Sequence, residues 1–163
     1  MNILNVEPKK IYFSAYENLS QLEKAVKLIE ERRPIDFKIT VMGTVFKICA
    51  EQNNGDLKNH YLLQEYWNIL LRNHPKLGVF YNPELGSTFI VGTLASAFMN
   101  EINGKILGSL LVGPYAIIRG MGATEAQALE LINALKAQKY LILFRGERND
   151  LEKYKIILED IEQ

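Results

Sequence analysis

A short glycine-rich segment, Gly120 to Thr124, carries the residue types best suited to binding a small ligand. A glycine-rich turn that leads into a helix offers free backbone N–H groups and the positive end of the helix dipole, which suit phosphate or carboxylate. Arg119 precedes the turn, and Arg145 or Arg148 can close over it if the later strand lies alongside. We therefore predict an anion site formed by Arg119, Gly120, Gly122, Thr124 and Arg145.

The same segment also fits a purely structural role. It lacks the third glycine of a dinucleotide-binding motif and the Lys-Ser/Thr pair of a phosphate-binding loop. Thr124 and Gln127 have the spacing of a capping box, which would satisfy the helix N-terminus without a ligand. Both interpretations stay open on the sequence.

Cysteine and histidine are too sparse to indicate catalysis or a metal site. His60 and His74 are the two histidines, and neither has the nearby partner that zinc sites require. Cys49 lies beside Ile48 at the end of an expected strand, where a packed thiol is favoured over a nucleophile with a lowered pKa. We predict no catalytic residues, no metal and no cofactor, and hence a protein that is not an enzyme.

Large aromatic side chains in the middle of the chain are candidates for a contact surface. Tryptophan and tyrosine often anchor protein interfaces. The helical spacing around Trp67 also fits a core position, and that interpretation is favoured for this residue. The candidate contact residues are Trp67, Phe80, Tyr81, Phe89 and Phe98.

Apolar periodicity and turn residues place these side chains on a series of helices and strands. Ser20 and Glu23 form a second candidate capping box, at the start of a helix whose apolar residues recur every three or four positions. Residues 88–112 are ambiguous between helix and strand, because apolar runs there are interrupted by glycine. The expected elements are strands at Ile11–Tyr16, Phe37–Val41 (continuing toward Ile48) and Tyr140–Phe144, helices at 20–32, 56–74, from 124 and from 149, and an irregular Pro75–Ser87.

This pattern predicts one α+β domain over residues 1–163. Terminal strand-helix-strand units, 8–50 and 113–163, are expected to form a ferredoxin-like sandwich. Residues 51–112 are expected to be an inserted, helical middle segment that is apolar and contains glycine.

Charge and cysteine content narrow the classes of function. Nineteen basic and nineteen acidic residues balance in a chain of 163, which argues against a general nucleic-acid binder. The single Cys49 excludes an internal disulfide and suits a reducing compartment, and the N-terminus lacks the pattern of a secretory signal. We expect a cytoplasmic protein. Membrane contact ranks below core or subunit packing, because no basic cluster flanks the apolar runs.

The two ends of the chain resemble the bacterial general-stress-protein family of unknown function. The residues that carry the resemblance are Tyr12 to Glu17 at the front and, at the back, Gly113-Pro114-Tyr115, Gly120 to Ala128, and Leu135 to Gly146. They cover about half of the chain. Leu57 to Gly86 departs from the family, because a charged, Trp-containing helix and loop stand where the family has a glycine zipper. The resemblance implies a ferredoxin-like framework and stress association, without catalytic residues.

The sequence as a whole predicts a stress-related structural or interaction protein that self-associates through apolar surface. A homo-oligomer is expected, with a further protein partner as an option and nucleic acid excluded. The alternative is a sensor or regulatory domain that binds a small anionic molecule at the Gly120–Thr124 turn.

Overall fold

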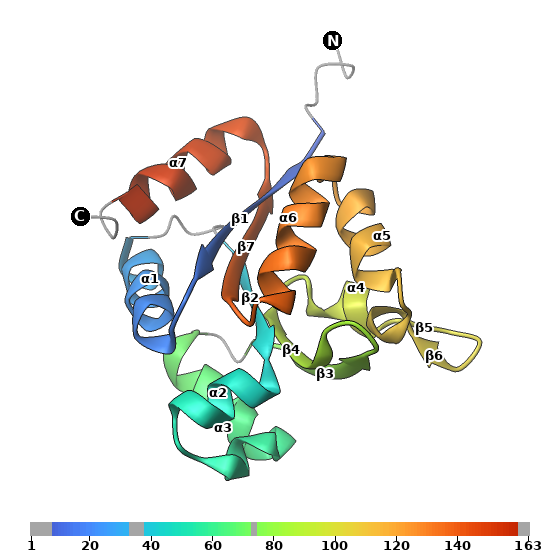
Figure 1. Ribbon diagram of the computed structural model, residues 1–163. Coiled ribbons are helices and arrows are strands. Elements are labelled where there is room, and N and C mark those ends of the chain that lie inside the picture. Colours follow the sequence, from blue (N-terminus) through green and yellow to red (C-terminus); the bar gives the residue numbers. More distant parts are fainter. Residues whose placement is uncertain (1–7, 33–37, 73–74, 160–163) are drawn as a thin grey trace.

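A five-stranded antiparallel sheet organises the protein. The computed structural model describes residues 8–32, 38–72 and 75–159. The strands lie in the order β1-β7-β2-β4-β3 (Figure 1). Their bounds are β1 Lys10–Tyr16, β2 Ile39–Thr44, β3 Leu77–Asn82, β4 Gly86–Gly92 and β7 Tyr140–Gly146.

Strands from both ends of the chain lie next to each other in this sheet. β7 runs between β1 and β2, pairing Ile11 with Arg145 on one side and Ile39 with Phe144 on the other. β1 and β2 are therefore parallel to each other, and α1 (Leu19–Arg32) connects them across β7. This is a split strand-helix-strand unit closed by the C-terminal part of the chain.

Helices cover both faces of the sheet, so the molecule has three layers. Side chains alternate along β7: Tyr140 and Ile142 enter one apolar cluster, whereas Leu141 and Leu143 enter the other. The helices on the first face are α1, α2 (Val45–Glu51), α3 (His60–Leu70) and α7 (Arg148–Glu159); those on the second are α4 (Ala95–Met99), α5 (Gly113–Gly120) and α6 (Glu125–Lys136) (Figure 1).

The expected helices at both ends are present, with one change in capping. The buried residues Leu22, Val26 and Ile29 form the core-facing stripe of α1, as their spacing predicts. The cap of α1 is Asn18, whose side-chain oxygen accepts a hydrogen bond from the N–H of Gln21, and not the predicted Ser20. Glu23 therefore does not form the predicted capping box, and its carboxylate instead accepts a hydrogen bond from the Tyr66 hydroxyl.

The strand predicted to continue from Val41 toward Ile48 is wrong beyond Thr44. The Thr44 hydroxyl accepts a hydrogen bond from the N–H of Lys47 and begins α2, so Cys49 lies in a helix and not at a strand end. The residues Val45, Phe46 and Ile48 favour strands, but local capping by Thr44 decides the conformation.

The middle of the chain is not a helical insert. Pro75–Ser87, expected to be irregular, contains the edge strand β3, and β4 follows it, so residues 88–92 are strand. Gly78 allows β3 to pack beneath Met99, because a Cβ at this position would lie 2.4 Å from the Met99 side chain. The remaining elements of the middle are α3, η2 (Gly55–Lys58), η3 (Leu107–Ser109), α4 and the hairpin of β5 (Glu101–Ile102) and β6 (Lys105–Ile106).

These observations establish a mixed α+β fold with a five-stranded antiparallel sheet. The fold differs from the expected ferredoxin-like sandwich in two respects: helices cover both faces of the sheet, and the middle of the chain supplies two strands. His74 and Phe37 lie outside the described residues. Within the described segments, every helix is too short or too polar to cross a membrane.

Candidate functional site

The predicted anion turn joins α5 to α6 and meets Arg145 from β7. The Nε of Arg145 donates a hydrogen bond to the carbonyl oxygen of Met121 at 3.1 Å. Arg119 reaches back along α5 to the Tyr115 hydroxyl at 3.3 Å. The sheet therefore brings Arg145 to the turn, as the prediction required, whereas Arg119 is directed along its own helix.

The backbone donors of this turn already have partners within the protein. Thr124 and Gln127 form the complete capping box, with the Thr124 N–H donating to the Gln127 side chain and the Gln127 N–H donating to the Thr124 hydroxyl. The N–H groups of Gly122 and Ala123 donate to carbonyl oxygens of α5. Gly122 has φ +110° and lies so close to Lys9 that a Cβ would be 2.5 Å from its carbonyl oxygen. The hydrogen bonds thus favour the structural interpretation of the turn.

Four of the five predicted contact residues are core residues and cannot form a surface. Trp67, Phe89 and Phe98 are completely buried and Phe80 nearly so; only Tyr81 is exposed. Phe80 and Tyr81 are neighbours on a strand, so they point to opposite sides. The prediction of Phe80 as a contact residue is wrong because it assumed a loop where β3 forms. Trp67 packs on Phe89 with ring centroids 5.4 Å apart, as the favoured core interpretation of Trp67 predicts.

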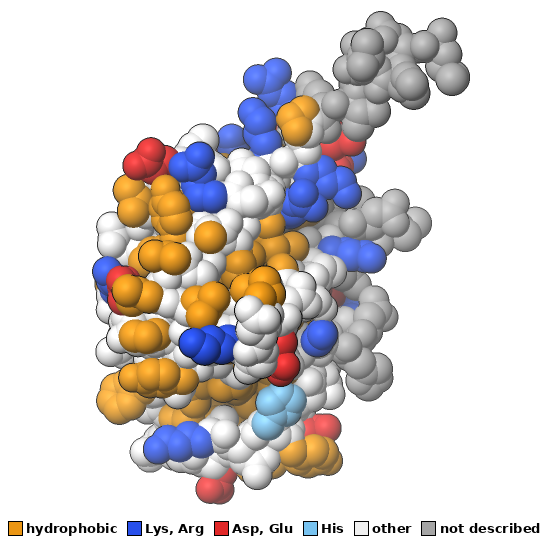
Figure 2. Space-filling view, turned by 90° about the vertical axis from the view of Figure 1, so that its right-hand side faces the viewer, with side chains coloured by type: hydrophobic (Ala, Val, Ile, Leu, Met, Phe, Trp, Pro, Cys, Tyr) orange, Lys and Arg blue, Asp and Glu red, His pale blue; other side chains and the backbone are white. Residues whose placement is uncertain are grey.

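A different group of apolar side chains is exposed between η3, α5 and α6. We call it the aliphatic surface: Leu110, Leu111, Val112 and Leu129. Leu111 and Val112 are 58% and 67% exposed, and Leu110 precedes them directly. Figure 2 shows hydrophobic side chains gathered on this flank of the molecule. The sequence placed Leu110 to Val112 in an apolar run but gave no sign that they would be exposed.

Asn82, at the end of β3, holds the backbone of the aliphatic surface in place. Its side-chain N–H groups donate to the carbonyl oxygens of Gly108 and Leu110, both at 2.9 Å. A depression of about 240 Å³ lies here, and Leu111, Val112 and Leu129 line it. At its border Lys136 pairs with Glu84 at 2.9 Å. The surface therefore has an aliphatic centre, a polar border and a fixed backbone.

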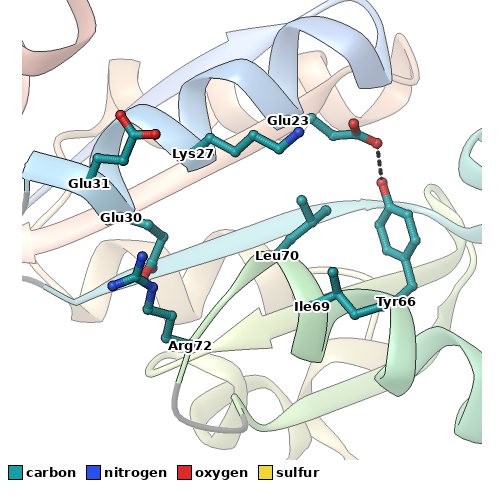
Figure 3. Close-up of a pocket in the computed structure, with 8 residues that line it drawn as sticks. All are labelled: Glu23, Lys27, Glu30, Glu31, Tyr66, Ile69, Leu70 and Arg72. Carbon is teal, nitrogen blue, oxygen red and sulfur yellow. Dashed lines mark hydrogen bonds between the residues drawn. The ribbon is translucent and has the colours of Figure 1, made fainter.

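The opposite flank carries a charged groove of about 420 Å³ between α1 and α3. Figure 3 shows Lys27 and three glutamates on the α1 side facing Ile69, Leu70 and Tyr66 on the α3 side. None of the eight residues that line it is a serine, cysteine or histidine. Alternating charges over an apolar floor can hold an amphipathic molecule, but they supply no nucleophile beside a base.

Two hydrogen-bonded tyrosine–carboxylate pairs lie beside this groove, one joining α3 to α1 and the other joining β7 to α2. The Tyr66 hydroxyl donates to Glu23 at 2.6 Å, and the Tyr140 hydroxyl donates to Glu51. Glu51 also accepts the N–H of Leu19, the first residue of α1. Burial and these hydrogen bonds raise the pKa of both tyrosines well above the ordinary value, so both hydroxyls stay neutral donors. The pairs stabilise the contact of α3 with α1 and of α2 with β7.

The remaining chemical candidates do not converge. Burial raises the pKa of the Cys49 thiol, which disfavours the nucleophilic thiolate. His60 is exposed at the start of α3. Among the described residues there is no cluster of histidine, cysteine and carboxylate side chains able to hold a metal ion.

Comparison with protein-family models, with curated proteins and with solved structures finds no match to this chain.

Proposed function

We propose that this protein is a non-enzymatic interaction protein that self-associates through the aliphatic surface. The observation that carries the proposal is the exposure of three consecutive aliphatic side chains, Leu110, Leu111 and Val112. Single exposed apolar residues are ordinary, whereas a contiguous group is typical of a contact site. The hydrogen bonds from Asn82 fix its backbone, so little conformational entropy is lost on association.

A second copy of this chain is the occupant that fits this surface. The formal net charge is zero, so two copies do not repel each other. Most soluble homo-oligomers use two-fold contacts in which the same patch lies on both sides. An aliphatic centre bordered by Glu84 and Lys136 has the arrangement of such contacts, with an apolar core and a polar rim.

The physiological role of this association is proposed from the sequence resemblance alone. The segments 12–17, 113–115, 120–128 and 135–146 carry the resemblance to bacterial general stress proteins, so we propose a stress-related role. A ferredoxin-like relationship is proposed from the split β1-α1-β2 unit with β7 between its strands. A cytoplasmic location is proposed from the single Cys49.

Light scattering over about a hundredfold range of protein concentration tests self-association. The wild type is expected to shift toward a larger species as the concentration rises. Leu129→Asp places a charge in the aliphatic surface and is expected to remain monomeric at every concentration. Ile156→Asp is the matched control, because Ile156 is similarly exposed but lies on α7, on the other face of the sheet. A wild type that is monomeric throughout would refute the proposal.

A further inference from the structure

Although the net charge of the chain is zero, three basic residues gather at one end of the sheet. Lys9 directly precedes β1, Lys38 directly precedes β2, and Arg145 is the penultimate residue of β7. The registers Ile11 with Arg145 and Ile39 with Phe144 bring these three cations to the same end of the sheet. Figure 2 shows lysine and arginine side chains gathered toward this upper end, where β1 begins in Figure 1.

These cations border a single polar depression of about 480 Å³. Lys9, Lys38 and Arg145 line it together with Glu147, which directly precedes α7, and Asp150 in the first turn of α7. Thr93, which follows β4, also lines it. Its volume is within the range of small-molecule sites, about 300 to 1,000 Å³. The depression is distinct from the aliphatic surface and from the groove between α1 and α3, since they share no lining residue.

The three cations are available to a ligand. None of them forms an ion pair with another residue in the described part of the chain. The Nε of Arg145 donates to the carbonyl oxygen of Met121, which orients the guanidinium. The terminal N–H groups of the guanidinium remain as donors for a ligand. One guanidinium and two ammonium groups around one depression suit the oxygens of a phosphate.

The two carboxylates restrict which phosphate compound fits. Glu147 and Asp150 repel a bare polyanion, but they accept hydrogen bonds from hydroxyl groups. A nucleic-acid backbone brings successive phosphates and needs a basic path without carboxylates. We propose that this depression binds a small molecule that carries one phosphate group and neighbouring hydroxyl groups, such as a sugar phosphate. This site is independent of the proposed self-association.

Isothermal titration of the full chain with ribose 5-phosphate tests the proposal. The wild type is expected to bind it saturably. Lys9→Gln combined with Lys38→Gln removes two charge-assisted hydrogen bonds and is expected to weaken binding by about tenfold or more. The matched control is Lys10→Gln combined with Arg148→Gln, which removes the same charge near the same end from residues that do not line the depression. The control is expected to bind nearly as the wild type does.

The carboxylates supply a second, sharper test. Asp150→Asn is expected to strengthen the binding of inorganic phosphate, because a repelling charge is lost. The same variant is expected to bind ribose 5-phosphate less favourably, compared with inorganic phosphate, than the wild type does. Absence of saturable binding to ribose 5-phosphate overturns the proposal. Equal losses in the two double variants overturn it too, since they indicate a diffuse basic surface. Tighter binding of a single-stranded oligonucleotide than of ribose 5-phosphate indicates a nucleic-acid surface instead.

Discussion

The two helical flanks cover the same sheet by different means. On the flank of α1, α2, α3 and α7, hydrogen bonds from tyrosine hydroxyls to carboxylates join α3 to α1 and β7 to α2, and charged residues border the apolar ones in the groove between α1 and α3. On the flank of α5 and α6, aliphatic and aromatic residues fill the core, and Leu111 and Val112 lie outside it in a depression that Glu84 and Lys136 border. The first flank carries polar contacts between its elements, whereas the second exposes three consecutive aliphatic residues, Leu110 to Val112.

The largest effect is expected where the first flank meets the sheet. Trp67→Ala removes a completely buried side chain that packs on Phe89, and it is expected to lower the free energy of unfolding by about 3–5 kcal/mol. Tyr81→Ala, at an exposed position on the edge strand, is expected to change it by less than about 0.5 kcal/mol. Urea denaturation of both variants measures the difference. Similar losses for the two substitutions would contradict the burial that separates them.

A smaller loss is expected from the polar contacts of the same flank. Glu51→Ala leaves the Tyr140 hydroxyl and the N–H of Leu19 without their acceptor, which is expected to cost about 1–3 kcal/mol. Glu152→Ala is the control, because this glutamate makes an exposed contact at 3.9 Å with Lys155, a type of ion pair that contributes little to stability. Chemical denaturation compares the two, and equal stabilities would show that the Glu51 contacts do not hold α1 and α2 together.

Alkaline pH is expected to weaken the first flank selectively. The folded protein raises the pKa of Tyr66 and Tyr140, whereas the unfolded chain ionises its tyrosines near about pH 10. The stabilisation from this difference is complete below that pH and is lost as the pH rises toward the folded values. Unfolding followed between neutral and alkaline pH should show stability falling more steeply for the wild type than for Tyr66→Phe combined with Tyr140→Phe. Parallel curves would contradict the raised pKa values.

The smallest effect is expected at the turn before α6. Thr124→Ala removes half of the capping box and is expected to cost about 1 kcal/mol. Thr124→Ser keeps the hydroxyl and should restore the stability. Thermal denaturation of the two variants measures this, and a Thr124→Ala protein as stable as the wild type would return the turn to the ligand-binding interpretation.

Local patterns predicted the parts of the fold that depend on neighbouring residues. The spacing of Leu22, Val26 and Ile29 predicts α1, the Thr124–Gln127 pair predicts the start of α6, and the apolar run at Tyr140 predicts β7. Two errors arose where contacts outweigh local propensity. Thr44 begins a helix among strand-forming residues, and Gly78 belongs to a strand that pairs with β4.

The candidate surfaces depended on long-range contacts that the sequence does not display. Phe80 and Leu111 are both large apolar residues in glycine-containing segments, yet Phe80 is buried by η3 and α4 while Leu111 is exposed. The depression at the basic end requires Lys9, Lys38 and Arg145 to meet, and only the pairing of β7 between β1 and β2 brings them together. Arg145 alone was predicted as a ligand residue.

Sedimentation velocity of two matched variants tests the central claim most directly. Leu111→Asp charges the aliphatic surface, and Ile69→Asp charges an aliphatic residue that is even more exposed, in the groove of the opposite flank. Self-association through the α5–α6 flank predicts that the wild type and Ile69→Asp sediment as the same oligomer while Leu111→Asp sediments as a monomer. A monomeric wild type, or an oligomer that Ile69→Asp abolishes and Leu111→Asp preserves, would contradict it.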